Sequence, residues 1–358
     1  MAATMNPMNA PWPFLRPDLR QKPGLRFNAL NGANSAKSQT EGEHSLGSSG
    51  TLPADLFSFQ APIFQPPVFH ASAGKNRFAV IGDAGTGDAA QYNISRQMEV
   101  WRQQLPFNQV LVLGDNVYPA GEPALFDERI TQPYQNLRRQ GVQFFPVLGN
   151  HDVKAGFGNQ QLAYWGVPPY YSFKMGSPGA DVEIFAVDTT VMLPGYLNGF
   201  DHNPAAFAQR DKAQSLWLEE ALARSNASMK VVMGHYPLFS KAAFAKPKRL
   251  LFQQTLERKL SDILVRHQVD LYLAGHEHHY EAPVGINGVR YMVSGAGGGK
   301  LDLPQKGVPE GAGVVKKNHF MLFENTPAGL SYRVISDQGK VFDFGLIPRK
   351  RRVLDTLI

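Results

Sequence analysis

The amino-acid sequence predicts an α/β fold in which two β-sheets pack face to face with helices on the outside. Three observations lead to this prediction. Short apolar runs alternate with helical segments, each run ends in a loop with glycine and polar residues, and the scheme occurs twice along the chain. Alternating strands and helices are typical of mainly parallel sheets, because right-handed crossovers link neighbouring parallel strands. Such sheets bind ligands beyond the carboxyl ends of their strands, so functional side chains are expected there.

The first half of this scheme contains three expected strands. Apolar runs at 78–81, 110–113 and 144–148 are separated by helical segments at 89–105 and 126–140. Each run leads into a loop that begins with glycine, as expected where a buried strand ends in a turn. An aspartate therefore follows each of the first two expected strands. The polar residues in these loops are Asp83 in the first, Asp115, Asn116 and Tyr118 in the second, and Asn150 and His151 in the third.

The second half repeats the scheme after a less regular region at 155–211. Two of its strands lead into His235 and into the histidine-rich segment 275–279. Short strands within 289–347 are expected to complete a second sheet that packs on the first. The expected elements are strands at 170–173, 182–187, 230–233, 269–273, 290–293, 319–323 and 330–335, and helices at 214–223 and 250–267.

The segment Gly275-His-Glu-His-His279 follows an apolar strand and has the composition of a metal site. His276 and His278 stand two residues apart, so in extended backbone both rings would point to the same face. A polar loop that is merely rich in histidine is the alternative, because short histidine tracts indicate metal binding by composition only. We therefore consider this segment together with the polar residues at the other strand ends.

Composition excludes several classes of site. The 358-residue chain has no Cys, which rules out disulfides, thiolate metal sites and cysteine nucleophiles and leaves His, Asp, Glu, Asn and Tyr as metal ligands. The net charge of +6 is a mild excess that would attract anionic ligands. Its basic residues are scattered or in short clusters, so nucleic-acid binding is not expected. No apolar run reaches about 18 residues, and no membrane-spanning helix is expected.

The two ends of the chain differ in character from the middle. Residues 1–75 are rich in Pro, Gly, Ser and Asn and show no sustained period, which predicts an arm that is partly disordered or packed on the surface. Prolines interrupt residues 1–30, so no clear secretory signal is expected there. We predict a catalytic domain at 76–348 and a basic tail at 349–358.

Five short blocks resemble those of the metallophosphoesterase superfamily, and within it the small, single-domain purple acid phosphatases of the tartrate-resistant type. The resemblance covers roughly residues 78–323, and it implies a four-layer αββα sandwich of two mixed sheets flanked by helices. The wider superfamily usually has a histidine where this chain has Gly85, and Tyr118 would supply the replacement ligand. The blocks are Gly82-Asp-x-Gly85, Gly114-Asp-x-x-Tyr118, Gly149-Asn-His151, Gly234-His235 and Gly275-His-x-His278.

The resemblance implies a centre of two metal ions. One ion, Fe(III) in this family, would be held by Asp83, Asp115, Tyr118 and His278. The second, a divalent Fe, Zn or Mn, would be held by Asn150, His235 and His276, with Asp115 bridging the two. This division agrees with ligand chemistry, because carboxylate and phenolate are hard donors that suit a trivalent ion, whereas imidazole and amide oxygen suit a divalent one.

We expect lesser roles for four further residues. His151 follows the predicted ligand Asn150, and we expect it to orient the phosphate and protonate the leaving alkoxide; support of a metal ligand is the alternative. Asn116 is expected to support the site, and His279 is a possible substrate contact. His202 is a possible additional acid, although an exposed loop histidine is the alternative.

The implied activity is hydrolysis of phosphate monoesters by a metal-bound hydroxide nucleophile, most active at acid pH. A phosphodiesterase that acts on cyclic nucleotides or other bis-esters is the alternative within the same fold. A non-enzymatic scaffold that retains the fold is a third hypothesis. The implied partners are small phosphorylated substrates or phosphoproteins. The resemblance favours a secreted, vacuolar or periplasmic location, although the missing Cys and the Pro-rich arm depart from the small animal members.

Overall fold

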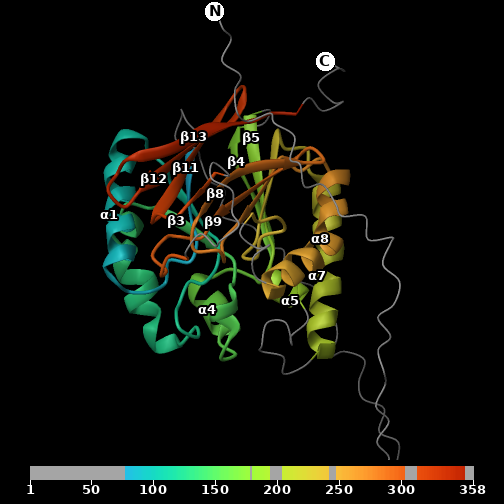
Figure 1. Ribbon diagram of the computed structural model, residues 1–358, viewed down its shortest axis with the longest axis horizontal. Coiled ribbons are helices and arrows are strands. Elements are labelled where there is room, and N and C mark those ends of the chain that lie inside the picture. The colour runs from blue at the N-terminus through green and yellow to red at the C-terminus, as the bar shows by residue number, and fades with distance from the viewer. Residues whose placement is uncertain (1–76, 178–179, 194–203, 242–246, 303–312, 351–358) are drawn as a thin grey trace, which may run out of the picture. The chain divides into compact units, whose positions relative to one another are not determined.

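The computed structural model describes residues 77–177, 180–193, 204–241, 247–302 and 313–350, which form two sheets with helices on either side (Figure 1). The predicted arm at 1–75, the loop with His202 and most of the predicted tail lie outside the described residues. No helix among those described is both long and apolar enough to span a membrane.

The first sheet contains the three strands predicted in the first half of the chain. Strands β1 (Arg77–Ile81), β2 (Gln109–Val112) and β3 (Gln143–Pro146) are parallel, with Ala79 opposite Val110 and Val110 opposite Phe144. Its six strands run in the order β13 (Val341–Pro348), β12 (Gly329–Ser336), β11 (His319–Thr326), β1 (Arg77–Ile81), β2 (Gln109–Val112) and β3 (Gln143–Pro146).

The second sheet contains the strands that lead to His235 and to the histidine-rich segment. Strands β5, β6, β7 and β9 run parallel to one another, whereas β4 pairs antiparallel with β5, β8 with β9 and β10 with β8. Both sheets are therefore mixed, as predicted. The seven strands run in the order β10 (Val314–Val315), β8 (Tyr280–Ile286), β9 (Val289–Ser294), β7 (Leu271–Ala274), β6 (Met229–Met233), β5 (Ala180–Ala186) and β4 (Tyr171–Ser177).

The expectation that the last strands complete the second sheet is wrong for β11, β12 and β13. Strand β11 pairs antiparallel with β1, so these three strands extend the first sheet. The pairing stacks Phe323 on Phe78, with ring centroids 5.1 Å apart. Of the late strands predicted from the sequence, only β9 lies in the second sheet.

The strands alternate between two cores, which gives the four layers. In β1, Phe78 and Val80 face the core between the sheets, whereas Ala79 and Ile81 face the core under helix α1 (Ala89–Gln104). In β7, Leu271 faces the inter-sheet core and Tyr272 faces the helices on the other side. A period of two is what a strand buried on both faces requires. The predicted αββα sandwich is confirmed.

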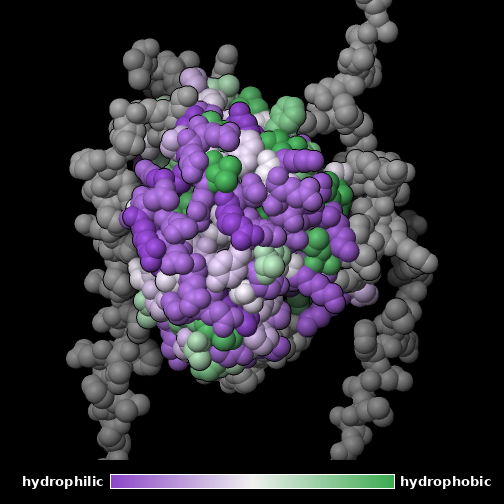
Figure 2. Space-filling model, turned by 90° about the vertical axis from the view of Figure 1, so that its left-hand side faces the viewer, coloured by the Kyte–Doolittle hydropathy of each residue, from purple (hydrophilic) through white to green (hydrophobic). Residues whose placement is uncertain are grey.

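Helices cover the outer faces of both sheets. In Figure 1, α1 lies on one side of the sheets and α7 (Pro204–Arg224) and α8 (Pro247–Arg266) lie on the other. Helix α1 begins after Asp88, whose side chain accepts hydrogen bonds from the backbone of Ala90 and Gln91, as an N-cap does. The face on the α1 side is mainly hydrophilic where it is visible in Figure 2, and its apolar side chains are scattered.

The remaining helices are short and irregular. The helix expected at 126–140 is broken, and Pro133 lies in one of its tight turns, because proline cannot donate to the helical hydrogen-bond ladder. This stretch consists of η3 (Pro123–Leu125), the π-helical turn η4 (Asp127–Thr131), η5 (Gln132–Tyr134) and α2 (Gln135–Arg139). Further short helices are α3 (Asn150–Val153), α4 (Gly158–Trp165) and α5 (Thr189–Met192).

Candidate metal centre

The seven side chains predicted as metal ligands come together from loops of both sheets. The first sheet contributes the loops after β1, β2 and β3, and the second contributes those after β6 and β7. The first three loops carry Asp83, Asp115 with Tyr118, and Asn150, and the other two carry His235 and the pair His276 and His278.

Three of these residues have left-handed backbone. The φ angles are 55° at Asp83, 52° at Asp115 and 67° at His276. Residues other than glycine rarely adopt this conformation, and it persists only where surrounding contacts hold it. Here the Asp83 carboxylate accepts a hydrogen bond of 2.8 Å from the backbone N–H of His276, and the Asp115 carboxylate accepts one of 2.9 Å from that of His151. Hydrogen bonds between the loops therefore hold their backbone conformations in place.

Two glycines leave room for the carboxylates. A Cβ atom on Gly149 would lie 2.2 Å from Oδ1 of Asp115, and one on Gly275 would lie 2.4 Å from Oδ2 of Asp83. Any larger residue would displace these oxygens. The glycines that begin the third and fifth sequence blocks are thus explained by the close approach of a carboxylate.

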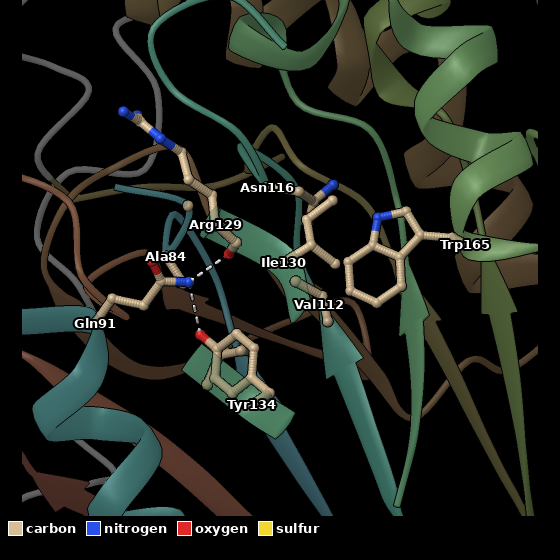
Figure 3. A pocket seen from close by; sticks show the side chains of 10 residues that line it. Ala84, Gln91, Val112, Asn116, Arg129, Ile130, Tyr134 and Trp165 are labelled. Atoms are coloured by element: carbon tan, nitrogen blue, oxygen red, sulfur yellow. Dashed lines mark hydrogen bonds between the residues drawn. The ribbon is translucent and has the colours of Figure 1, made fainter. Parts of the chain in front are cut away.

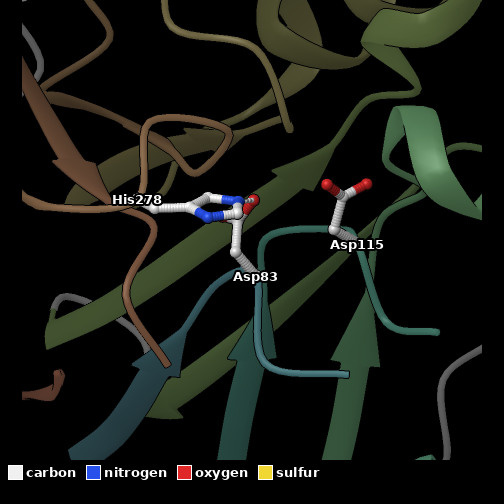
Figure 4. Close-up of side chains that lie close together, drawn as sticks. All are labelled: Asp83, Asp115 and His278. Atoms are coloured by element: carbon white, nitrogen blue, oxygen red, sulfur yellow. Dashed lines mark ion pairs between the residues drawn. The ribbon is translucent and has the colours of Figure 1, made fainter. Parts of the chain in front are cut away.

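The first group of predicted ligands consists of Asp83, Asp115, Tyr118 and His278. The hydroxyl oxygen of Tyr118 lies 2.9 Å from Nε2 of His278, 3.1 Å from Asp115 Oδ2 and 3.3 Å from Asp83 Oδ1. Candidate ligand atoms of Asp83, Asp115 and His278 all lie within 4.8 Å of one another (Figure 4). Two carboxylates, a phenol and an imidazole at this spacing can surround one cation.

The second group consists of Asn150, His235 and His276. Oδ1 of Asn150 lies 3.0 Å from Nε2 of His235 and 3.0 Å from Nδ1 of His276, and the two ring nitrogens are 3.3 Å apart. Oδ1 of Asp115 lies 3.5 Å from His235 Nε2, while its Oδ2 faces Tyr118. Asp115 therefore lies between the two groups.

Backbone carbonyls fix the orientation of two rings. Nδ1 of His235 donates to the carbonyl of Leu113 at 2.8 Å, and Nδ1 of His278 donates to that of Lys300 at 2.7 Å. A hydrogen bond at Nδ1 leaves Nε2 as the nitrogen with the lone pair, which is how metal-binding histidines are commonly held. In both residues it is Nε2 that faces the candidate centre.

The histidines of the site differ in the direction in which their pKa is shifted. Burial lowers the pKa of His276 well below its usual value, which keeps this ring neutral. Burial also disfavours charge on His235 and His278, but nearby carboxylates outweigh it: Asp115 and Asp83 raise the pKa of His235, and Asp83 raises that of His278 to about 9. A proton on these rings and a bound metal ion exclude each other. Either one would compensate the negative charge of the same carboxylates.

The donor set fits the metals that the family resemblance implies. The group around Tyr118 offers hard oxygen donors, and the group around Asn150 offers two imidazoles and an amide oxygen. The first combination suits a trivalent ion and the second a divalent ion. The fit is one of donor chemistry and proximity, and the individual ligand roles stay a prediction.

His151 lies beside the centre on α3. Its Nδ1 lies 2.7 Å from the carbonyl of Pro119, and its ring packs against that of Tyr118 with centroids 4.5 Å apart. The side chain is half-buried. With Nδ1 as a donor to Pro119, Nε2 is the nitrogen that can exchange a proton with a ligand.

Asn116 turns away from the centre into a buried hydrogen-bond network. Its Nδ2 donates to the carbonyl of Val147 at 2.9 Å, to Asp152 Oδ2 at 3.0 Å and to Gln161 Oε1 at 2.9 Å. Oδ1 of Asp152 also accepts from the backbone of Asn116 and Val117. This geometry suits the supporting role expected for Asn116, because it fixes the loop that carries Asp115.

Two supporting residues were not identified from the sequence. Asp152 holds the loops after β2 and β3 together, and burial followed by the charge of Asp115 raises its pKa to about 7. Its position directly after Gly149-Asn-His151 was the available signal. Thr189 accepts hydrogen bonds of 3.1 Å from the backbone N–H groups of both His235 and Tyr236.

His279 does not face the candidate centre. It is 2% exposed, and its Nε2 lies 2.8 Å from Oε1 of Glu281. Burial on its own would raise the pKa of Glu281, but the contacts with His279 and the hydrogen bonds from Lys241 and Ser240 together lower it. A supporting role is thus the interpretation that this geometry favours over contact with substrate. His202 lies outside the described residues.

A small pocket adjoins the loops of the centre without being part of it. Gln91 crosses this pocket and donates to the carbonyl of Arg129 at 2.8 Å and to the hydroxyl of Tyr134 at 3.3 Å (Figure 3). Arg129 donates in turn to the carbonyl of Tyr118. None of the seven predicted ligands, all of which the structure describes, lines the pocket. Its walls support the turn that carries Tyr118.

Comparison with known proteins identifies sequence relatives over most of the chain. The family model for calcineurin-like phosphoesterase matches residues 76–280. Tartrate-resistant acid phosphatase type 5 of Oryctolagus cuniculus is 31% identical over 243 residues, which cover 62% of this chain and 72% of the relative. The Mus musculus protein of that name is 31% identical over 66% of this chain and 77% of its own. Purple acid phosphatase 17 of Arabidopsis thaliana is 29% identical over 63% of this chain and 69% of its own.

Solved structures show the same fold at lower identity. GAP50, the anchor in the inner membrane complex of Plasmodium, has a TM-score of 0.63 and 18% identity, over 78% of this chain and 90% of that one. A dimetal phosphatase from Danio rerio has a TM-score of 0.52 and 14% identity, over 77% of this chain and 99% of that one. At such identities the likeness concerns the fold alone.

Proposed function

This chain belongs to the calcineurin-like phosphoesterase family, as a purple acid phosphatase-like member, and from that premise we propose that it hydrolyses phosphate monoesters at a centre of two metal ions. Family membership makes the chain a hydrolase of phosphate esters. The restriction to monoesters, the ligand set and the identity of the ions belong to the proposal.

One observation carries the proposal: the seven donors form two groups with Asp115 between them. Asp83, Asp115, Tyr118 and His278 would hold an iron(III) ion. Asn150, His235 and His276 would hold a divalent iron, zinc or manganese ion, which Asp115 would share. When bound, two such ions neutralise the phosphoryl oxygens and lower the pKa of water.

The protein's own residues have two further tasks in this proposal. His151 holds one ring nitrogen on the carbonyl of Pro119 and offers the other to the leaving-group oxygen, which it protonates. The interlocked loops keep Asp83 and Asp115 oriented, so that little rearrangement is needed when a phosphate binds. Small phosphate esters or phosphoproteins are the proposed substrates, and a secreted, vacuolar or periplasmic location is part of the same proposal.

Asp115→Asn tests the assignment most directly. The change keeps the size of the side chain but removes the anionic charge shared by both groups, so we expect loss of bound metal and a fall in kcat of at least about 100-fold. Metal content and turnover of p-nitrophenyl phosphate measure both effects. The control is Asp262→Asn, which alters an exposed carboxylate on α8.

Two results would count against the proposal. If Asp115→Asn retains metal and normal turnover, the two-metal assignment is wrong. If the wild type turns over bis(p-nitrophenyl) phosphate faster than the monoester, the enzyme is a phosphodiesterase of the same fold. The second result would leave the metal assignment intact.

A further inference from the structure

The turn that follows β7 points its side chains alternately to two sides. His276 and His278 face the candidate metal centre, whereas Glu277 and His279 face a buried, charged cluster behind it. Glu277 is only 1% exposed. A carboxylate so deeply buried between two predicted metal ligands requires a charged partner, because isolated buried charge is costly.

Arg249, near the start of α8, supplies that partner. Its Nη1 donates to Oε2 of Glu277, and its Nη2 lies 2.9 Å from Oδ2 of Asp302. The backbone N–H of Asp302 donates at 3.0 Å to the carbonyl of His278. The guanidinium of Arg249 therefore contacts two carboxylates. One belongs to Glu277, which lies between the two histidines, and the other to Asp302, which is hydrogen-bonded to the backbone of His278.

The cluster has the composition of a cation site, and Arg249 fills it. Ligand-type atoms of Glu277, His279 and Asp302 lie within 4.8 Å of one another. The guanidinium already contacts both carboxylates of this set, so the arginine is the resident cation. Its planar fork can bond two carboxylates at once, which the single ammonium of lysine does less well.

We propose that Arg249 is a positioning residue that sets the spacing of His276 and His278 by neutralising Glu277 and tying Asp302 to the same helix. This inference rests on the proposed two-metal function. His276 needs such support because its backbone is left-handed, with φ at 67°. Without Arg249, the uncompensated carboxylate of Glu277 would draw the turn toward solvent or toward the metals and change the distance between the two rings.

The test is metal affinity, measured apart from activity. Metal-depleted protein is titrated with Zn²⁺ in equilibrium dialysis, and circular dichroism checks that each variant is folded. Arg249→Ala is expected to lower the affinity for Zn²⁺ by about 10- to 100-fold, the usual effect of losing a residue that orients a ligand. Arg249→Lys should lie between Arg249→Ala and wild type. The control is Lys248→Ala, which removes the exposed neighbouring cation.

A second pair of variants separates positioning from general destabilisation. If Arg249 acts by neutralising Glu277, then Arg249→Ala should cost clearly less affinity in a Glu277→Gln background than in the wild type, and the loss that remains reflects the contact with Asp302. An undiminished loss in that background would overturn the inference, and so would wild-type affinity in Arg249→Ala. If Arg249→Ala is unfolded, the comparison of Glu277→Gln with the double variant decides. A wild type that binds no metal would instead refute the proposed function.

Discussion

At the scale of single residues, hydrogen bonds to backbone carbonyls decide which ring nitrogen of three histidines at the centre stays available. His151, His235 and His278 each direct Nδ1 at a backbone carbonyl and leave Nε2 available. For His235 and His278 that nitrogen faces other predicted ligands, but no such contact is found for His151 among the described residues. The same ring arrangement can thus serve metal binding in two positions and proton transfer in the third.

We predict that His151→Asn lowers kcat by about 100- to 10,000-fold while metal content stays unchanged. The loss should be larger for an alkyl phosphate than for p-nitrophenyl phosphate, because a poor leaving group depends more on protonation. Turnover of both substrates measures the difference. Equal losses on the two substrates would indicate that His151 only supports its neighbours, and loss of metal would make it part of the ligand shell.

We predict that iron-loaded protein is coloured and that Tyr118→Phe abolishes the colour. The phenol of Tyr118 lies among three predicted ligands, and a tyrosinate bound to iron(III) absorbs visible light. Absorption spectra of metal-analysed samples provide the measurement. Tyr164→Phe, at a ring that is 43% exposed, is the control and should keep the colour. A colourless, iron-loaded wild type would count against Tyr118 as a ligand.

Sequence reasoning predicted that the candidate ligands would lie close together, as they do, but it did not predict their backbone conformation. It expected His276 and His278 to converge because extended backbone points alternate residues to one face. The two rings do face the centre, but from a turn in which His276 is left-handed. That conformation depends on the hydrogen bond from the backbone of His276 to Asp83, a residue 193 positions away in the chain. No local pattern encodes such a contact.

At the scale of elements, most local signals were reliable, although the helix expected at 126–140 is broken, and the pairing of the last strands was predicted wrongly. The helix expected at 89–105 is α1, and the strand expected at 230–233 lies in β6. The pairing of β11 with β1 was missed, because both candidate sheets offered an apolar partner and the strand sequence does not distinguish them. The network around Asp152 was missed for a similar reason, since its members come from the loop after β2, the segment after β3 and helix α4.

The start of β11 yields a prediction about acid stability. His319 is fully buried between Ser294 and the carbonyl of Lys317, and burial lowers its pKa to about 4. The unfolded chain takes up this proton near pH 6.5, so the neutral histidine contributes stability that is complete above pH 6.5 and lost as the pH falls toward 4. The expected loss is about 3 kcal/mol.

The comparison is between wild type and His319→Asn, both metal-depleted, in urea unfolding at pH 7 and pH 4. The variant should be less stable at pH 7, but its stability should fall by less between the two pH values. Because His276 titrates alike in both proteins, its contribution cancels in the difference. Identical pH dependence in the two proteins would show that His319 does not carry this effect.

At the scale of the whole molecule, the candidate centre joins the two sheets. Asp83, Asp115 and Asn150 follow strands of the first sheet, whereas His235 and His276 follow strands of the second. The sandwich and the convergence of the predicted ligands were predictable together from the sequence, because each strand end carried a polar residue that a parallel sheet would bring to one edge. The apolar core between the sheets also links them.

Metal binding at such a joint should stabilise the fold as a whole. The unfolded chain cannot hold five loops in place, so metal binds the native state preferentially and stabilises it by about 2.7 kcal/mol when free metal is 100-fold above its Kd. A chelator should therefore lower the melting temperature by roughly 5 to 10 °C, and added iron and zinc should restore it. Asp115→Asn, which is predicted to lack the shared ligand, should melt at the same temperature with and without the chelator. Equal melting of metal-loaded and chelated wild type would mean that the ions do not link the sheets, since ligands from both must be ordered to bind them.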